Sequence, residues 1–134
     1  MKIVLDTNVL VSGLLQPYGS PGQIVRMASS GVLELCHDSR ILSEYREVLL
    51  RPKFTFQQKD VDALLELIKF CGHSVSAQPL EIAFPDPDDK IFLEVALSGR
   101  AAYLVTGNLK HFSTYKRKEV KVVSPSDFLS SYRA

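Results

Sequence analysis

The sequence has few cysteines and no long apolar run, and each shortage excludes a class of protein. Cys36 and Cys71 are too few for the disulfide framework of a small secreted protein, so we expect two buried thiols in a reducing compartment. No segment supplies the roughly 20 consecutive apolar residues of a membrane-spanning helix, because Asp6 interrupts the first apolar run. We therefore expect a cytoplasmic protein without a targeting segment and without membrane association.

The chain also lacks a large excess of charge of either sign. It carries 16 basic and 15 acidic side chains, a formal net charge of +1. The field of the whole molecule therefore does not indicate a polyanionic partner, and any nucleic-acid-binding surface must be local. Its 134 residues, 46% of them hydrophobic, are enough for one core, and we expect a single domain over residues 1–134.

Short apolar segments alternate along the chain with segments of helical periodicity. The apolar segments predict strands at residues 2–5, 32–36, 73–76, 102–105 and 120–123. The periodic segments predict helices at residues 9–15, 21–29, 39–50, 59–71, 89–98 and from 125 onward, with Ser39 as the cap of the third. This alternation predicts an α/β fold of the Rossmann-like kind, a three-layer α/β/α sandwich around a central parallel sheet.

Polar residues occur at positions that place them at one edge of such a sheet. Asp6 directly follows the first strand, and Asn108 comes soon after the strand that ends at residue 105. Glu44 lies in the first turns of the helix after the second strand, and Asp89 begins the helix before the fourth. Because ligands of open parallel sheets bind beyond the carboxyl ends of the strands, we expect these four side chains to converge.

Three converging carboxylates favour a particular chemistry. Oxygen ligands without a supporting histidine or cysteine cluster suit Mg²⁺ or Mn²⁺ better than zinc. Carboxylates packed together also repel one another and raise one another's pKa unless cations lie between them. Because such ions can deprotonate a water molecule and stabilise the leaving oxygen of a phosphodiester, the residues predict metal-dependent hydrolysis, with Asp6, Glu44 and Asp89 as metal ligands.

Each of these acidic residues also has an ordinary structural interpretation. An aspartate such as Asp6 at a strand end is often a turn former or a helix cap. In residues 86–89, Asp-Pro-Asp-Asp, the first aspartate can cap a helix and the others favour the positive end of its dipole. Glu44 lies on the polar side of its helix, where most glutamates are only solvated. The functional interpretation therefore depends on their shared location.

Four motifs, taken in order, resemble those of a PIN domain, the nuclease fold of VapC-type toxins in toxin–antitoxin pairs. They are Ile-Val-Leu-Asp-Thr-Asn-Val at 3–9, Ser-Glu-Tyr-Arg-Glu-Val-Leu at 43–49 followed by Arg-Pro-Lys-Phe at 51–54, Asp-Pro-Asp-Asp at 86–89, and Leu-Val-Thr-Gly-Asn at 104–108. The resemblance covers nearly the whole chain. It implies a metal-dependent endoribonuclease that prefers single-stranded RNA, forms a homodimer and is inhibited by a protein antitoxin.

The resemblance also assigns roles by position. Asp6, Glu44 and Asp89 match the three principal acidic residues of the family, and Asp89 is favoured over its neighbours because Ala96 follows seven positions later. Asn108 falls at the fourth position, where family members often carry an aspartate, or an asparagine soon followed by one, whereas here His111 follows. A neutral fourth position predicts that one metal ion binds well and a second more weakly.

Further candidates surround these positions. Possible additional ligands or substrate contacts are Thr7, Asn8, Ser12, Asp86, Asp88, Thr106 and His111. A possible RNA-binding rim with a ring for base stacking consists of Lys110, Tyr115, Lys116, Arg117, Lys118 and Lys121. The hydroxyls could instead bond nearby backbone groups, and the lysines could be a solvated surface.

The neutral fourth position leaves other functions open beside an endoribonuclease. One alternative is a catalytically weakened PIN-like module that binds RNA or a protein partner without cleavage. Another is a phosphatase or a DNA nuclease that uses the same metal chemistry.

Overall fold

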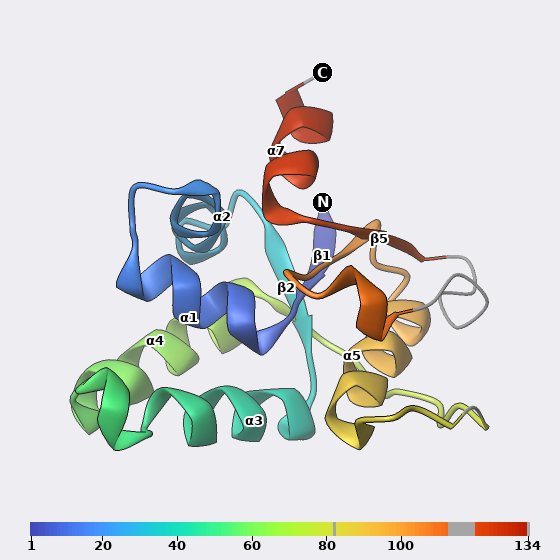
Figure 1. Cartoon of the computed structure of the whole chain (residues 1–134), viewed down its shortest axis with the longest axis horizontal. Helices are drawn as coiled ribbons and strands as arrows, with labels where there is room; N and C mark the ends of the chain where they lie inside the picture. The colour runs from blue at the N-terminus through green and yellow to red at the C-terminus, as the bar shows by residue number, and fades with distance from the viewer. Residues whose placement is uncertain (82, 113–119, 134) are drawn as a thin grey trace.

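The computed structural model describes residues 1–81, 83–112 and 120–133, and at its centre lies a parallel sheet (Figure 1). Its described strands are β1 (Lys2–Leu5), β2 (Glu34–His37), β3 (His73–Ser74), β4 (Tyr103–Val105) and β5 (Lys121–Val123). They lie in the order β3-β2-β1-β4-β5, and each pair of neighbours is parallel. The central strand β1 is an apolar run of which Ile3, Val4 and Leu5 are fully buried.

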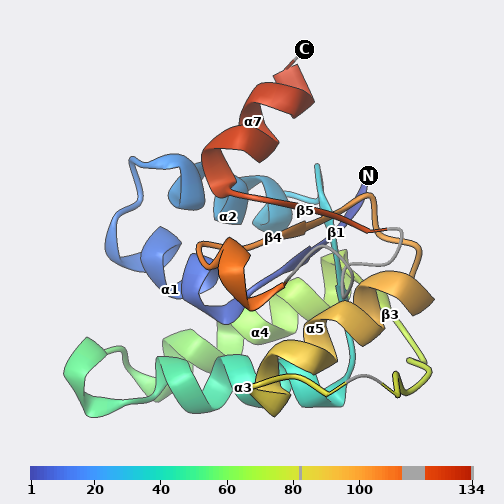
Figure 2. The same ribbon diagram turned by 45° about the vertical axis from the view of Figure 1, so that its right-hand side comes forward.

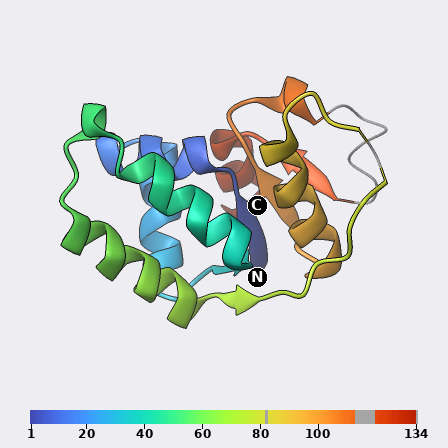
Figure 3. The same cartoon turned by 90° about the horizontal axis from the view of Figure 1, so that it is seen from below.

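Helices cover both faces of this sheet. They are α1 (Thr7–Leu15), α2 (Ser20–Ser29), α3 (Ser39–Leu49), α4 (Gln58–Cys71), α5 (Pro87–Ser98) and α7 (Pro125–Arg133), with 3₁₀ turns η1 (Pro52–Phe54) and η2 (Leu109–His111). Figure 3 shows α1 to α4, in blue to green, on one side of β1 and α5 on the other. Right-handed crossovers require this, because the chain moves outward from β1 to β3 and then returns across the sheet to β4. The predicted three-layer sandwich is confirmed.

The predicted element boundaries hold to within about two residues, but the predicted cap of α3 is wrong. Helix α1 begins at Thr7 rather than at residue 9, and β2 begins at residue 34 rather than 32. The N-cap of α3 is Asp38 and not Ser39, since the Asp38 carboxylate accepts a hydrogen bond from the Ile41 N–H at 3.0 Å. An aspartate one residue earlier satisfies the free N–H group, so Ser39 becomes the first helical residue.

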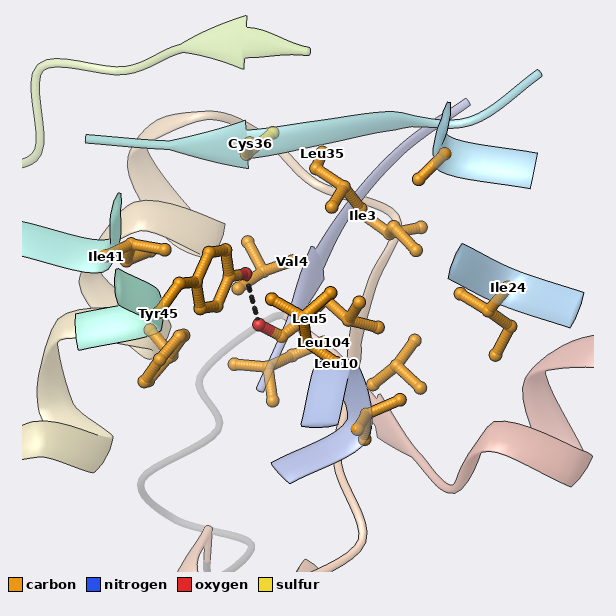
Figure 4. Packing of buried hydrophobic residues seen from close by; sticks show 14 of the residues in the cluster. Ile3, Val4, Leu5, Leu10, Ile24, Leu35, Cys36, Ile41, Tyr45 and Leu104 are labelled. Atoms are coloured by element: carbon orange, nitrogen blue, oxygen red, sulfur yellow. Dashed lines mark hydrogen bonds between the residues drawn. The ribbon is translucent and has the colours of Figure 1, made fainter. Parts of the chain in front are cut away.

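A buried hydrogen bond ties α3 to the end of the central strand. Tyr45 is fully buried, and its hydroxyl donates to the Leu5 carbonyl at 2.5 Å (Figure 4). The partners are the neighbours in sequence of Glu44 and Asp6. This hydrogen bond in the hydrophobic core therefore fixes the backbone next to Asp6 and Glu44, two of the predicted metal ligands.

The prediction of two buried thiols holds for Cys36 but not fully for Cys71. Cys36 in β2 is buried and Cys71 at the end of α4 is partly buried, and both are free thiols. Burial raises the pKa of the Cys36 thiol to about 11, so this group is unreactive near neutral pH. Within the described residues, no helix combines the length and the apolar character needed to cross a membrane.

Candidate active site

The start of α1, the second half of α3, the start of α5 and η2 come together near the carboxyl end of β1 (Figure 2). Side chains from these elements line a polar pocket of about 170 Å³. Its lining residues are Asp6, Thr7, Asn8, Glu44, Val48, Arg51, Asp86, Asp88, Asp89 and His111. The three predicted metal ligands thus share one pocket, at the edge where an open parallel sheet binds its ligands.

Asp6 is held at the floor of this pocket. Its backbone N–H donates to the Val105 carbonyl at 2.9 Å, which continues the pairing of β1 with β4 beyond the last strand residue. The Thr106 hydroxyl donates to the Asp6 carboxylate at 2.7 Å and itself accepts from the Asn108 N–H at 3.0 Å. Burial raises the pKa of Asp6, which is 5% exposed, and the bond from Thr106 partly offsets that rise.

Glu44 reaches the pocket from α3 and is held by a residue of α1. The Thr7 hydroxyl donates to the Glu44 carboxylate at 2.7 Å. Burial raises the pKa of Glu44, the bond from Thr7 lowers it, and the negative charges of Asp88 and Asp6 raise it further. Thr7 therefore orients a carboxylate rather than only satisfying nearby backbone groups.

Asp89 lies in the first turn of α5, opposite His111. Its carboxylate lies 3.1 Å from Nδ1 of His111, and the residue is 8% exposed. Burial is the largest cause that raises the pKa of Asp89 to about 6, and neighbouring carboxylates add to it while His111 opposes it. Asp86 caps α5 by accepting from the Asp88 N–H at 2.9 Å, so its structural interpretation holds although it also lines the pocket.

The lining suits a hydrated hard cation more than a complete protein cage. Among the described residues, no three His, Cys, Asp or Glu side chains are arranged to hold one metal ion together. The donors are nevertheless carboxylate and hydroxyl oxygens. Burial, with a smaller contribution from neighbouring carboxylates, raises the pKa values of Asp6, Glu44 and Asp89, and a cation would compensate the cost of ionising them. Because Mg²⁺ is usually bound by one or two carboxylates and keeps several waters, the chemistry of this donor set fits such an ion.

The other predicted residues divide between the pocket and its surroundings. Thr7, Asn8, Asp88 and His111 line the pocket. Asn108 and Lys110 line a neighbouring hollow of about 440 Å³, which shares His111 with it. Ser12 is exposed on α1 and lines neither. Lys121 is exposed on β5, and Tyr115, Lys116, Arg117 and Lys118 lie outside the described residues.

Arg51 was not among the functional candidates predicted from the sequence. This residue lines the pocket together with Glu44 and Val48 of α3. Arg51 follows the end of α3 at Leu49, seven residues after Glu44 and three after Val48. A spacing close to two helical turns from Glu44 was a signal that could have identified it.

Comparisons with known proteins agree with this architecture. The family model for the PIN domain matches residues 2–110. An uncharacterized protein of Methanocaldococcus jannaschii is 27% identical over 143 residues, covering 98% of this chain and 92% of the relative. The crystal structure of VapBC2 from Rickettsia felis, bound to a DNA fragment from its promoter, contains a similar chain, with a TM-score of 0.60 and 16% identity. That match covers 92% of this chain and 98% of the other, and it supports the fold.

Proposed function

The chain belongs to the PIN domain family, and we propose that it is a metal-dependent endoribonuclease that hydrolyses phosphodiester bonds in single-stranded RNA. One observation supports this proposal most: Asp6, Glu44 and Asp89, which are distant in sequence, line the same pocket. Their raised pKa values give the pocket a reason to bind a divalent cation, and the family gives the reaction class.

Each proposed ligand has a distinct supporting contact. In the proposal, Asp6, Glu44 and Asp89 together hold a hydrated Mg²⁺ or Mn²⁺ ion, one or two of them directly and the rest through its bound waters. The ion would supply activation of water and charge neutralisation at the phosphate when it is bound. Thr106 and Thr7 donate to Asp6 and Glu44, and so restrict the rotation of these carboxylates. Asn108 lines the neighbouring hollow rather than this pocket, so we propose one well-bound ion and a weaker second one.

The proposed biological setting follows from the family. We propose a toxin component of a toxin–antitoxin system, homodimeric, cytoplasmic and inhibited by a protein antitoxin. The fold likeness to a chain of the VapBC2 structure and the PIN membership support this setting. Two free thiols are compatible with a reducing compartment.

Substitution of Asp6 tests the activity. We expect the purified protein with Mn²⁺ or Mg²⁺ to cleave single-stranded RNA, and Asp6→Asn to lose at least 100-fold in rate, as loss of an essential metal ligand does. Asp62→Asn is the matched control, because Asp62 is an exposed partner of Arg46 on another face of the molecule and should leave the rate unchanged. Undiminished cleavage by folded Asp6→Asn protein would refute the assignment. Turnover on single-stranded DNA and phosphomonoesters separates the other metal-dependent hydrolases.

A module that binds RNA or protein without cleavage is the second candidate. One contact favours it: His111, near the neutral fourth position, already pairs with Asp89 at 3.1 Å. Calorimetry distinguishes the two candidates. The nuclease requires divalent-metal binding at neutral pH, whereas the binding module predicts none, together with an RNA affinity that a chelator leaves unchanged.

A further inference from the structure

Arg51 is a cation in the lining of an otherwise acidic pocket. Five carboxylates line the pocket, from Asp6, Glu44, Asp86, Asp88 and Asp89, and the basic residues in the same lining are Arg51 and His111. Such a concentration of negative charge repels a polyanionic strand unless positively charged groups lie close to the phosphates of the strand. If the pocket acts on RNA, a positively charged side chain at its edge can therefore bind a phosphate of the strand.

The backbone holds Arg51 in place. It lies two residues after the end of α3 at Leu49, between α3 and η1. Its N–H donates to the Val48 carbonyl at 3.1 Å, and Pro52 begins η1 immediately afterwards. The guanidinium thus extends from a fixed turn at the end of α3 and not from a long loop.

The donors of Arg51 are less engaged than those of His111 and Arg40. Its Nη2 lies 4.0 Å from Glu47, beyond hydrogen-bonding distance, and the Glu47 side chain is 74% exposed. By contrast, His111 lies 3.1 Å from Asp89, and Arg40 lies 2.7 Å from Glu94. The half-exposed guanidinium can therefore present its planar pair of donors to an oxyanion.

We propose that Arg51 binds a phosphate group flanking the one that is cleaved, and so positions single-stranded RNA across the pocket. The inference rests on the proposed nuclease function. The Arg51 side chain is half-exposed, whereas Asp6 and Asp89 are buried, so Arg51 lies at the edge of the pocket rather than among the proposed metal ligands. Arg51 is then a substrate-binding residue that sets the path of the strand between the end of α3 and η2.

Two variants of Arg51 and a control at Arg46, in the last turns of α3, test this proposal. Arg46→Met removes the same charge from α3, and Arg46 has similar exposure, 45% against 50%, but lines the groove toward α4 instead of the pocket. Steady-state cleavage of a short fluorescent RNA is measured at several NaCl concentrations. Anisotropy measures binding of the same RNA without metal.

We expect Arg51→Met to raise KM and weaken RNA binding by about tenfold, with kcat within about twofold of the wild type. The slope of log affinity against log salt should decrease by about 0.7, the value for one phosphate contact on a single strand. Arg51→Lys should recover part of the affinity because it keeps the charge without the bidentate geometry. Arg46→Met should resemble the wild type.

Three results separate the possible failures. If Arg51→Met behaves like Arg46→Met, or lowers kcat at unchanged KM, the inference is overturned. If the wild type binds RNA without cutting it and Arg51→Met weakens that binding, the phosphate contact stands while the proposed nuclease function fails. If the wild type neither binds nor cuts RNA, both are wrong.

Discussion

Asp89→Asn should make the protein more stable while removing its activity. Asp89 is 8% exposed, and burial followed by the charges of Asp6, Asp86 and Asp88 raises its pKa from 3.8 to about 6 against the opposing effect of His111. A carboxyl whose pKa is higher in the folded state than in the unfolded chain costs stability when it is ionised. Asparagine keeps the shape and removes this charge.

The size of the gain follows from the pKa. A rise from 3.8 to about 6 corresponds to about 3 kcal/mol of destabilisation at neutral pH. The pocket is open to water, so we reduce this figure to about 2 kcal/mol. Asp89 also lies in the first turn of α5, where losing a negative charge costs about 0.5 kcal/mol. We therefore expect Asp89→Asn to gain about 1 to 2 kcal/mol, or about 3 to 7 °C in Tm.

The pH dependence has a defined sign. Above pH 6 the Asp89 carboxyl of the folded protein is ionised, and the destabilisation is fully present. As the pH falls from about 6 toward 3.8, this carboxyl takes up a proton in the folded protein, and the destabilisation disappears. Urea unfolding monitored by circular dichroism, with a chelator present, measures this at pH 7.5 and pH 4.5. The gain at pH 4.5 should be less than half of that at pH 7.5.

Asp88→Asn is the matched control for this experiment. Asp88 is the preceding residue and lines the same pocket, but it is exposed. Its substitution should change stability by less than about 0.5 kcal/mol. The reasoning is refuted if Asp89→Asn is less stable than the wild type at pH 7.5, or if its gain is the same at both pH values. Adding Mn²⁺ should raise the Tm of the wild type more than that of Asp89→Asn.

Two further predictions concern the contacts that support the site. Tyr45→Phe should lower the free energy of unfolding by about 1 to 2 kcal/mol in urea denaturation, because the buried Leu5 carbonyl loses its donor; an unchanged midpoint would contradict this. Arg40→Met should cost about 2 kcal/mol, because it leaves the carboxylate of Glu94, which is 4% exposed, without its ion-pair partner. The exposed pair of Arg46 should contribute less than about 0.5 kcal/mol, and equal losses for Arg40→Met and Arg46→Met would contradict the role of burial.

The sheet and the location of the site could be predicted because each depends on local signals. The apolar run at residues 2–5 ends at Asp6, and a parallel sheet places all such strand ends at one edge. Asp89 follows an N-cap and a proline that begin a helix, so its place in the first turn was also readable from sequence. These inferences need only short segments and the handedness of the fold.

The side-chain contacts within the pocket could not be predicted in the same way. Thr106 donates to Asp6 across 100 residues, and His111 lies against Asp89 from a 3₁₀ turn whose path no periodicity specifies. Such contacts depend on the relative positions of β1, β4 and α5 to within about 1 Å, since hydrogen bonds tolerate little variation in distance. The sequence therefore indicates which residues come together at the pocket but not which contacts orient each side chain.

These contacts explain why mutating a pocket carboxylate and mutating a residue that supports the site should change the stability of the fold in opposite directions. Asp6, Glu44 and Asp89 each contact a side chain that favours the ionised carboxylate, yet burial still raises their pKa values. The folded protein consequently bears a cost for ionising these buried carboxylates that its own groups do not offset, and a cation or a neutral substitution lowers that cost. Glu94 lies five residues farther along α5, where Arg40 and the Leu80 N–H, both at 2.7 Å, bond its two oxygens. Loss of charge should therefore stabilise the fold at Asp89, whereas loss of Arg40 should destabilise it.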